Sequence, residues 1–434
     1  MNILIIGVSG FIGNHLYHAL LQQGHQLSGC SRHKVANINW MPCNLVCKES
    51  NQVADYWRDK LQNIDVVINA VGIYQQSRKQ SFKQVHDVGV TRLFDACIKQ
   101  NIRVIQISAI GAEKNKPVNE FLQTKRNADQ YLANSDITHV VLYPGIVLGE
   151  GGKTTQQLSM LAYLFCIPMV FGRHRKLPLI SIFQLSDFIV NIINNWQNNK
   201  YDETIKKSQA KVLIAKPETM ENMIVNLRLW MSRGKFKNAC FIYMPEKIIE
   251  WSFKMFPNLS IGAFNKQSIE MLNDYSMQKS NVTEYIPVSH ETASDSLKIN
   301  KVTTAFINDR QLSMLFYINL LTLGVIWIVS GLNSIVNFEQ SRELIALTGI
   351  EKNIGDGFIM LAAIADIFLG LLLWVPDLRK RIIYLQLAVM LIYSLIITLL
   401  MPMYWLHPFA PIIKNFAMLV LALYLLADRR EINV

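Results

Sequence analysis

Charged residues are scarce in this chain, which excludes an ordinary soluble enzyme. Asp, Glu, Lys and Arg make up 17% of the 434 residues, whereas 51% are hydrophobic. The hydrophobic excess is concentrated in the last quarter of the sequence, where long apolar runs follow one another. We therefore expect a water-exposed domain followed by membrane-spanning segments.

Three further features are missing. The net charge is +11, yet no dense cluster of Lys and Arg alternates with aromatic residues, so nucleic acid is a poor candidate partner. The six cysteines are scattered, and Cys43 and Cys47 are too isolated for a zinc site, so neither a metal site nor a disulfide is expected and a reducing compartment is favoured. No charged segment precedes the first apolar run, so we expect no cleaved signal peptide.

The first residues form the stretch around which the chain is organised. Residues 3–6 are a short apolar run, typical of a parallel strand buried on both faces, and a glycine-rich turn and an apolar helix face follow. Glycines let the backbone approach a pyrophosphate, whose charge is stabilised by the N–H groups of a helix N-terminus. The turn therefore predicts a dinucleotide site, and a tight turn that binds nothing is the alternative. The residues expected to contact the dinucleotide here are Gly7, Ser9, Gly10, Phe11, Ile12 and Gly13.

The end of the second strand indicates which nicotinamide cofactor binds. The strand is expected at residues 26–32, and an acidic residue at its end would hydrogen-bond the ribose 2′-hydroxyl of NAD. This chain has Arg32 there, followed by His33 and Lys34, and cations suit the 2′-phosphate of NADP. NADP is therefore favoured over NAD, and a solvated basic loop is the alternative.

Alternating strand and helix patterns continue to about residue 150. Strands are expected at 39–45, 65–72 and 104–108, and a helix at 85–99. This order predicts an α/β fold with a doubly wound parallel sheet, the Rossmann arrangement. An adenine contact is expected where the third strand ends, and small residues at the end of the fourth strand allow close approach to the cofactor. The residues concerned are Asn44, Leu45, Ala70, Val71 and Gly72.

Together these motifs resemble the extended or atypical short-chain dehydrogenase/reductase superfamily over residues 1–150. The matching pieces are Gly7, Gly10 and Gly13, then Asn69-Ala70-Val71-Gly72, Ile107-Ser108-Ala109, Lys125 and Tyr143-Pro144-Gly145-Ile146-Val147-Leu148-Gly149. The resemblance implies that Ser108 orients the substrate and that Lys125 binds the nicotinamide ribose. It also implies cofactor contacts from Tyr143, Pro144, Gly145 and Ile146.

One position departs from that superfamily. Its Tyr-x-x-x-Lys motif would place a tyrosine four residues before Lys125, where this chain has Phe121. A phenol near a cation transfers a proton near neutral pH, and a phenyl ring does not. Tyr74 and Tyr143 are candidate substitutes, although a packing role is favoured for both. Either the cofactor is bound without ordinary dehydrogenase turnover, or the chemistry needs no tyrosine, as in hydride transfer to an electron carrier.

Residues 151–305 resemble the substrate-side part of the same superfamily, a smaller α+β region. Strands are expected at 178–182 and 211–215, and a helix at 220–230. A second helix is expected to start near residue 186, with Ser186 or Asp187 as its N-cap. No residue in this part specifies the substrate, and His174 and His290 are expected at the surface.

Residues 306–434 are expected to form a domain of four transmembrane helices. The apolar segments are 312–332, 358–374, 382–401 and 409–427, and those near twenty residues can span the hydrocarbon core. Arg379, Lys380 and Arg381 separate the second and third segments, and Arg429 and Arg430 follow the fourth. The positive-inside rule then predicts a multi-pass protein of a bacterial-type inner membrane with both termini cytoplasmic.

This region resembles the DoxX-like membrane domain over about residues 310–430. The matching pieces are Ser330-Gly331-Leu332, Ala365-Asp366-Ile367-Phe368-Leu369-Gly370 and residues 407–415. Asp366, Lys414 and Asn415 are costly in hydrocarbon, so we expect them to face the interior of the helix bundle. An Asp366–Lys414 pair beside a quinone-like or lipid ligand is one hypothesis, and a pair that only stabilises the bundle is the other.

Three functions remain open from the sequence. The first is a membrane-anchored NAD(P)H-dependent oxidoreductase whose partners are the nicotinamide dinucleotide, the bilayer and an apolar substrate such as a quinone or lipid. The second is a non-catalytic subunit that holds the cofactor for structure or sensing, as in the Rossmann-type accessory subunit of respiratory complex I. The third, epimerase or dehydratase action on a nucleotide sugar, needs the absent tyrosine. Fold alone decides none of them, and nothing predicts an oligomeric state.

Overall fold

The computed structural model describes residues 1–46, 53–73, 75–77, 80–169, 175–198, 208–234, 239–243, 245, 286–346, 351–400, 402–405 and 411–427. Side chains at 53–55, 168, 208–209, 286–287, 344, 404 and 411–414 are also outside this description. The chain divides into two compact units, Met1–Ile307 and Asn308–Val434. Each unit is considered by itself below.

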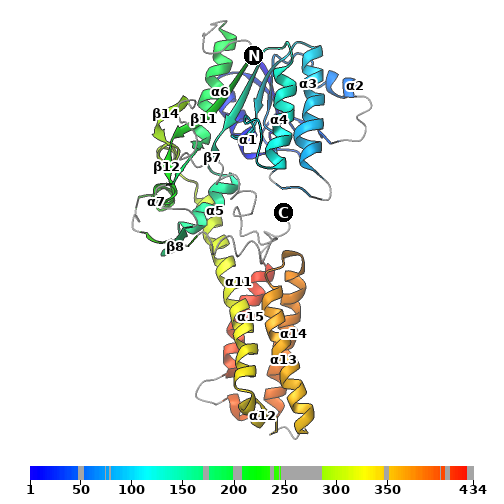
Figure 1. Cartoon of the computed structure of the whole chain (residues 1–434), viewed down its shortest axis with the longest axis vertical. Helices are drawn as coiled ribbons and strands as arrows, with labels where there is room; N and C mark the ends of the chain where they lie inside the picture. Colours follow the sequence, from blue (N-terminus) through cyan, green and yellow to red (C-terminus); the bar gives the residue numbers. More distant parts are fainter. Residues whose placement is uncertain are drawn as a thin grey trace. The chain divides into compact units, whose positions relative to one another are not determined.

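An eight-stranded sheet forms the centre of the first unit (Figure 1). Its order is β14-β11-β6-β5-β4-β1-β2-β3, and every neighbouring pair is parallel. The strands are β1 (Asn2–Ile6), β2 (Gln26–Ser31), β3 (Trp40–Pro42), β4 (Val66–Asn69), β5 (Arg103–Ile107), β6 (His139–Pro144), β11 (Ser208–Lys216) and β14 (Ile286–Thr292). The doubly wound parallel sheet predicted from the sequence is therefore present.

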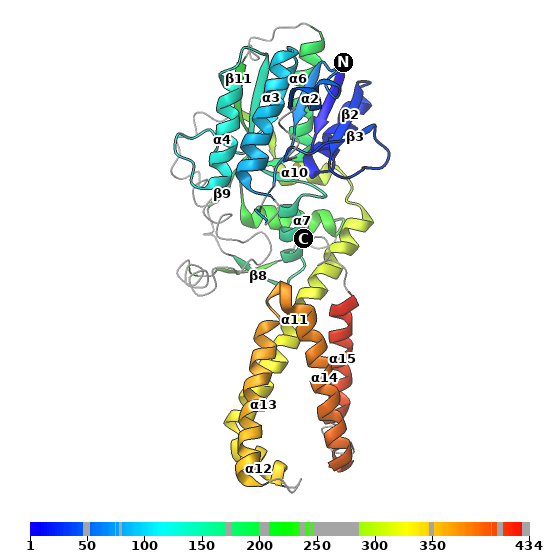
Figure 2. The same cartoon turned by 90° about the vertical axis from the view of Figure 1, so that its right-hand side faces the viewer.

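Helices cover both faces of this sheet (Figures 1 and 2), and its central strands β1, β4, β5 and β6 are buried. Helices α1 (Phe11–Gln22) and α6 (Ile182–Gln197) lie on one face, and α3 (Gly89–Lys99) and α4 (Glu120–Ala133) on the other, with α2 (Val53–Arg58) beside α3. The side chains of β1 divide accordingly: Ile3 and Ile5 pack on the first face, Leu4 and Ile6 on the second. The alternation of buried side chains explains the unbroken apolar run.

The helix predicted at 85–99 is divided in two. A π-helix at Lys83–Val88 precedes α3. Wider turns of this kind occur often near functional sites. The π-helical turn carries His86, which is buried beneath the end of β4 and contacts the candidate site described below.

In its described residues, the substrate-side region adds three short helices and three two-stranded sheets. The helices are α5 (Lys153–Leu161), α7 (Met220–Met231) and α10 (Ala293–Ile299). The sheets pair β7 (Ile146–Leu148) with β10 (Leu179–Ser181), β8 (Cys166–Met169) with β13 (Cys240–Tyr243), and β9 (Lys176–Leu177) with β12 (Glu218–Thr219). They enclose a third apolar core that includes Leu148, Leu179 and Leu227.

The predicted N-cap of α6 was wrong. The helix begins directly after β10, and Ser181 is its cap: the Ser181 hydroxyl accepts the N–H of Gln184 at 3.1 Å, and Gln184 Oε1 accepts the N–H of Ser181 at 3.0 Å. Ser186 lies one turn inside the helix, where its hydroxyl donates to the carbonyl of Ile182 at 2.8 Å. The reciprocal capping box at Ser181 satisfies the free backbone groups of the helix start, so no cap is needed at Ser186 or Asp187.

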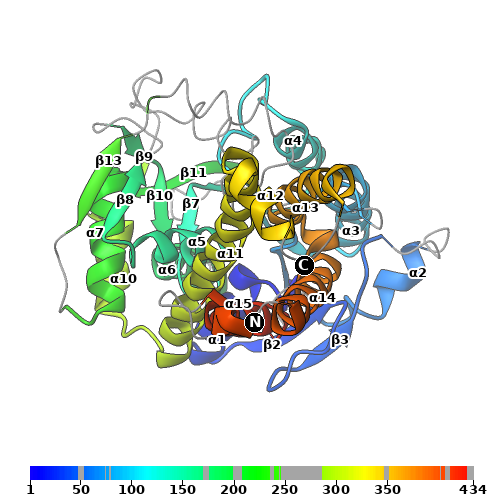
Figure 3. The ribbon, with the colours of Figure 1, turned by 90° about the horizontal axis from the view of Figure 1, so that it is seen from below.

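The second unit is a bundle of helices, seen from below in Figure 3. Its members are α11 (Thr304–Val336, which begins in the first unit), α12 (Phe338–Ala346), α13 (Lys352–Leu372), α14 (Pro376–Leu400) and α15 (Pro411–Ala427), with a short 3₁₀ turn, η4, at Pro402–Trp405. Within the described part of this unit, three helices, α11, α13 and α14, are long and apolar enough to cross a membrane. The fourth predicted segment coincides with the shorter helix α15.

Small residues bring α11 and α13 close together. A Cβ atom added to Gly331 would lie 2.7 Å from Cγ1 of Ile367 and even closer to the carbonyl oxygen of Ala363. A Cβ atom on Gly370 would lie 2.8 Å from the carbonyl oxygen of Gly324. Glycine is therefore required at both positions for this helix contact, the arrangement expected of packing within a bilayer.

Candidate cofactor-binding site

In the glycine turn after β1, the backbone packs so closely that side chains would not fit. Gly7 has a φ of +86°, its N–H donates to the carbonyl of Cys30 at 2.8 Å, and the N–H of Gly10 donates to the carbonyl of Gly7 at 2.9 Å. A Cβ atom on Gly13 would lie 2.9 Å from the carbonyl carbon of Gly7 and closer still to its oxygen. Gly10 is the N-cap of α1, and no side chain in the described part of the chain accepts a hydrogen bond from the first turn of the helix. The first N–H groups of α1 can therefore donate to a bound anion.

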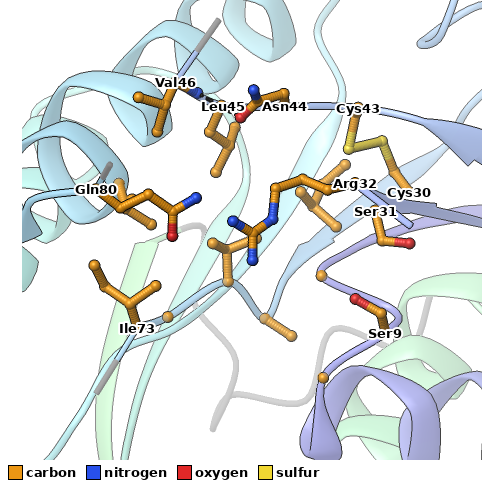
Figure 4. Close-up of a pocket in the computed structure, with 17 residues that line it drawn as sticks. Ser9, Cys30, Ser31, Arg32, Cys43, Asn44, Leu45, Val46, Ile73 and Gln80 are labelled. Carbon is orange, nitrogen blue, oxygen red and sulfur yellow. Dashed lines mark hydrogen bonds between the residues drawn. A yellow bond between two sulfur atoms is a disulfide. The ribbon is translucent and has the colours of Figure 1, made fainter. Parts of the chain in front are cut away.

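A cavity of about 280 Å³ opens at this turn (Figure 4). It lies where the strand order reverses, between the carboxyl ends of β1, β2 and β4, which is where dinucleotides bind in doubly wound sheets. The predicted residues that line it are Gly7, Ser9, Gly10, Arg32, Asn44, Leu45, Ala70, Val71 and Gly72. Phe11, Ile12 and Gly13 follow in the first turn of α1 and do not line the cavity.

Other residues that line the cavity were not predicted from the sequence. They are Ile6, Cys30, Ser31, Cys43, Val46, Ile73, Gln80 and Val85. Most of them directly adjoin the predicted ones at strand ends. Gln80 and Val85 come from the segment after β4, where the sequence carries no motif that points to a cofactor.

Arg32 extends into this cavity (Figure 4). It directly follows β2, and among the described residues that line the cavity it is the one Lys or Arg side chain. The main chain beside it is fixed, because the hydroxyl of Ser31 donates to the carbonyl of His33 at 2.7 Å. A guanidinium held there can bind a phosphate group in a bidentate manner.

The expectation that the chain has no disulfide was wrong. Cys30 and Cys43 are joined by a disulfide, and both line the cavity (Figure 4). Strands β2 and β3 are parallel neighbours, which brings the two Cα atoms to 5.6 Å, within the range that a disulfide spans. The thirteen-residue separation in the sequence gave no sign of this pairing, because it depends on strand order.

Lys125 lies next to the cavity, in α4. Its side chain is buried, and its Nζ is 3.7 Å from the position that a Cβ atom on Gly72 would take. Nζ donates to the carbonyl of Ile107 at 3.4 Å. Burial lowers the pKa of Lys125, and the nearby carboxylate of Asp129 opposes that shift. Lys125 is therefore a buried amine between the ends of β4 and β5, facing the glycine that forms one wall of the cavity.

Phe121 belongs to an aromatic cluster one turn before Lys125. Its ring centroid is 5.2 Å from that of His86 and 5.6 Å from that of Phe82, and Lys125 Nζ lies 5.8 Å from it. The position of the family tyrosine is therefore filled by apolar packing. Such a ring can position Lys125 but cannot transfer a proton.

His86 does not replace the missing tyrosine as an acid. Its Nε2 accepts the N–H of Ile73 at 2.9 Å, which assigns the ring proton to Nδ1, facing the hydroxyl of Thr124 at 3.4 Å. Burial, with a smaller effect of Lys125, lowers the pKa of His86 to about 2. The imidazole is therefore neutral, and both of its nitrogens have a partner within the protein.

Ser108, just beyond β5, is hydrogen-bonded to a buried carboxyl group. Its hydroxyl donates to Oδ2 of Asp129 at 2.5 Å, and Gln106 Nε2 donates to Oδ1 at 3.1 Å. Asp129 is 2% exposed, and burial raises its pKa to about 6 against the opposing effects of these hydrogen bonds and of Lys125. Ser108 was predicted from the sequence, and Asp129 was not. The available signal was its place four residues after Lys125, on the same face of α4.

Tyr143 packs in the core beneath α4 and is 7% exposed. Burial, with the charges of Asp129 and Glu113, raises the pKa of its phenol. Pro144, Gly145 and Ile146 continue from it; a Cβ atom on Gly145 would lie 2.9 Å from the carbonyl carbon of Pro178. None of these four lines the cavity. Tyr143 and Pro144 end β6, which lies two strands away from β4, and Ile146 begins β7.

Several further residues were candidates from the sequence, and the structure describes only some of them. Tyr74 and His174 lie outside the described residues, and His290 is exposed. In the second unit, the hydroxyl of Ser330 donates to Oδ2 of Asp366 at 3.1 Å, and Asn415 Nδ2 donates to Ser394 at 3.0 Å. The side chain of Lys414 lies outside the described part, so its pairing with Asp366 stays a hypothesis.

Two family models match this chain. A model described as NAD(P)H-binding matches residues 7–161, and the DoxX-like family matches residues 324–423. The chain therefore carries an NAD(P)H-binding domain followed by a DoxX-like domain. This confirms the fusion expected from the sequence motifs, and the DoxX-like match together with the long apolar helices indicates membrane association.

Two relatives of known description are similar to part of the chain. Ceramide reductase of Caulobacter vibrioides is 21% identical over 181 residues, 42% of this chain and 57% of that protein. The 40 kDa subunit of mitochondrial NADH-ubiquinone oxidoreductase from Neurospora crassa is 20% identical over 193 residues, 44% of this chain and 48% of that protein. The chain thus spans about half the length of these relatives.

Among solved structures, the UDP-glucuronic acid 4-epimerase of Bacillus cereus in complex with UDP-glucuronic acid and NAD is similar. It is 17% identical, with a TM-score of 0.43, and covers 64% of this chain and 100% of its own.

Proposed function

We propose that this chain, which joins an NAD(P)H-binding domain to a DoxX-like domain, is a membrane-anchored NADPH-dependent oxidoreductase that reduces an apolar or membrane-borne substrate. The observation that carries the proposal is the position of Lys125. Its buried amine faces the glycine wall of the cavity at the strand-order reversal and stands beside the Ser108–Asp129 pair. A site with these groups can hold a nicotinamide ring and a substrate oxygen next to each other.

The residues fit a dinucleotide. Gly7, Gly10 and Gly13 carry no side chains that would stand between the backbone and a pyrophosphate, and the uncapped start of α1 offers N–H groups for it. Asn44 and Leu45 would border the adenine, and Lys125 would bind the nicotinamide ribose. The bound cofactor would supply a hydride. Ser108 would orient the substrate oxygen, and Phe121 keeps water away from one side of Lys125.

The finer cofactor preference depends on Arg32. Replacing Arg32 with alanine is expected to weaken NADPH binding about 10- to 100-fold, because a charge-assisted contact to the 2′-phosphate contributes about 1.5–3 kcal/mol. NADH affinity should change far less, since NADH lacks this phosphate. Titration of both cofactors by fluorescence measures the two constants. Lys34→Ala is the matched control, because Lys34 is exposed and does not line the cavity; equal losses for NADPH and NADH in Arg32→Ala would contradict the assignment.

The apolar substrate is inferred from the second unit. Three helices long enough to cross a membrane would hold the site at a bilayer surface, where lipid-soluble molecules are concentrated. The name of one relative, ceramide reductase, refers to a lipid. The cluster Arg379–Arg381 near the start of α14 supports a multi-pass protein of an inner membrane with both termini cytoplasmic. The cofactor domain would then face cytosolic NADPH.

An absorbance assay tests the proposed activity. The detergent-purified protein is mixed with NADPH and, in turn, with short-chain quinones, long-chain aldehydes and lipid ketones. Oxidation of NADPH that requires one of these acceptors supports the oxidoreductase. Tight binding of NADPH with no turnover for any acceptor would contradict it.

A second candidate is a non-catalytic cofactor-binding subunit of a membrane assembly. Phe121 favours it, because the residue that normally transfers a proton is absent. The similarity to the 40 kDa subunit of a respiratory oxidoreductase points in the same direction. In this case, NADPH would raise the unfolding temperature of the protein without being consumed, and a Phe121→Tyr variant would remain inactive.

Asp366 tests whether the helix bundle takes part in the reaction. An Asp366→Asn variant keeps a hydrogen-bond acceptor for Ser330 and removes a carboxyl group that is costly within the bilayer, so we expect unchanged or higher thermal stability. If the bundle binds the substrate, turnover of a long-chain acceptor should fall severalfold while turnover of a short-chain quinone is retained. Thermal unfolding and parallel assays measure both effects. Unchanged turnover of both acceptors would leave Asp366 with a structural role.

A further inference from the structure

The proposed reduction needs a proton for the substrate oxygen, and the family tyrosine is absent. We propose that the Ser108–Asp129 pair supplies this proton: Ser108 is the catalytic donor that touches the substrate, and Asp129 is a positioning residue that passes its own proton to Ser108. This inference rests on the proposed function. It follows from the geometry of a buried chain of hydrogen bonds that begins at the cofactor cavity.

The direction of each hydrogen bond in this chain is determined. The backbone N–H of Val71, a residue of the cavity, can only donate, and it donates to Asn69 Oδ1 at 3.2 Å. Asn69 must therefore point its amide nitrogen toward Gln106, whose Oε1 accepts at 2.7 Å. Gln106 is then left to donate from Nε2 to Oδ1 of Asp129 at 3.1 Å. Each step fixes the next, so no amide along the chain can be reversed.

This order leaves one oxygen of Asp129 free to carry a proton. Oδ1 accepts from an amide, so the proton of the neutral carboxyl resides on Oδ2, the atom 2.5 Å from the hydroxyl of Ser108. When Asp129 is protonated, Oδ2–H donates to Ser108 and the Ser108 hydroxyl is free to donate elsewhere. When Asp129 is ionised, Ser108 must donate to the carboxylate instead. Only the protonated pair can therefore serve a substrate oxygen.

The step balances for a carbonyl substrate. The carbonyl carbon gains a hydride and the C=O π bond breaks, so the substrate is reduced by two electrons that come from NADPH. The substrate oxygen takes the proton of Ser108 as that O–H bond breaks. Ser108 is restored by the proton of Asp129, which becomes a carboxylate and is reprotonated from solvent. The products are an alcohol and oxidised cofactor.

Charges around Asp129 act in opposite directions. Lys125 from the same helix favours the carboxylate, as do the hydrogen bonds from Ser108 and Gln106 of β5, whereas Glu113 in the loop after β5 disfavours it. Tyr143 of β6 and Arg126 of α4 are also part of this electrostatic group. Burial outweighs them and raises the pKa of Asp129 to about 6, so a large share of the acid form is present near pH 6. The rate of reduction should then fall as the pH rises through this value, because the proton is lost.

Other groups at the site are poorly suited to this role. Phe121 has no proton to give, and His86 uses both ring nitrogens within the protein. Tyr143 has a phenol whose pKa is raised by burial and by the charge of Asp129 itself. Lys125 is committed to the carbonyl of Ile107 and to the ribose side of the cavity.

The test compares the full-length wild type with Asp129→Asn and Asp129→Glu in detergent. Asparagine keeps a donor for Ser108 but has no proton to release, so kcat near pH 6 is expected to fall about a hundredfold and the decline of kcat with pH to disappear. Glutamate should restore a pH-dependent rate. Asp136→Asn, at an exposed position just beyond α4, is the matched control and should keep the wild-type profile.

Infrared spectroscopy provides a readout that does not depend on turnover. Between about pH 5 and about pH 8, the wild type should lose carbonyl-stretch intensity from protonated carboxyl groups. The loss should be smaller in Asp129→Asn by the contribution of Asp129, because other buried carboxyl groups with a raised pKa, such as Glu218, remain. The proposal is overturned if the two proteins lose the same intensity, or if Asp129→Asn keeps the wild-type rate and pH profile. If the difference is present but the wild type reduces no acceptor, the proposed function is contradicted, and the proton-donor role of the pair is contradicted as a consequence.

Discussion

Replacing Lys125 with methionine is expected to lower NADPH-dependent turnover by at least about a hundredfold, the usual effect of removing a preorganised charge from a reacting site. The amine lies next to the cavity and beside Asp129, so its loss would remove the proposed ribose contact and a positive charge beside the proposed reacting groups. Methionine preserves most of the side-chain volume, and an uncharged group in a buried position should not destabilise the fold. Initial rates and thermal unfolding of the same preparation separate these effects.

The pH profile of Lys125→Met gives a second reading. Lys125 lowers the pKa of Asp129, so its removal should move the decline in rate to higher pH. Lys99→Met is the matched control, since Lys99 is exposed at the C-terminal end of α3 and does not line the cavity, and it should leave rate and profile unchanged. Wild-type turnover in Lys125→Met, with an intact fold, would show that the buried amine has no part in the reaction.

A Gly13→Ala variant is expected to lose at least about tenfold in NADPH affinity and about 1–3 kcal/mol of stability, the usual cost of overpacking. The added Cβ atom would meet the backbone of Gly7 at less than contact distance, and backbone cannot turn aside as a side chain can. The turn would have to open, which moves the N–H groups of α1 away from the pyrophosphate. Cofactor titration and denaturant unfolding measure the two losses.

Gly10→Ala tests the same prediction with a smaller steric clash in the same turn. Its Cβ atom would lie 3.2 Å from the carbonyl oxygen of Gly7, a distance that a small shift relieves, so smaller losses are expected. Gly357→Ala in α13, with open space around the new atom, should change neither quantity. If Gly13→Ala and Gly10→Ala weakened NADPH binding equally, tight packing at Gly13 would not explain the site.

The architecture could be predicted from the sequence because buried strands and membrane-spanning helices require apolar runs of characteristic length. The unbroken apolar run at residues 3–6 specifies a strand covered on both faces, and the structure places its side chains alternately in two cores. Long apolar segments likewise specified α11, α13 and α14 through length and composition alone. The N-cap of α6 was missed because Ser181 and Ser186 are residues of the same type. Which of the two serines caps the helix depends on where β10 ends.

The site could be predicted in part for a similar reason. Residues that follow strand ends, such as Gly7, Arg32 and Val71, reach one cavity because parallel strands end at one edge. The Cys30–Cys43 disulfide and the Ser108–Asp129 pair depend instead on which strands and helices are neighbours. Asp129 looks like an ordinary helix-surface acid in the sequence. Its burial against β5 becomes evident only when α4 is packed on the sheet.

The central claim is that a nicotinamide dinucleotide is held by a domain tied to a bilayer. The most direct test is flotation of lipid vesicles reconstituted with the full-length protein in the presence of radiolabelled NADPH. The account predicts that protein and label rise together with the vesicles, and that Gly13→Ala rises without the label. Label that stays at the bottom of the gradient with wild-type protein, or protein that remains there in the absence of detergent, would contradict it.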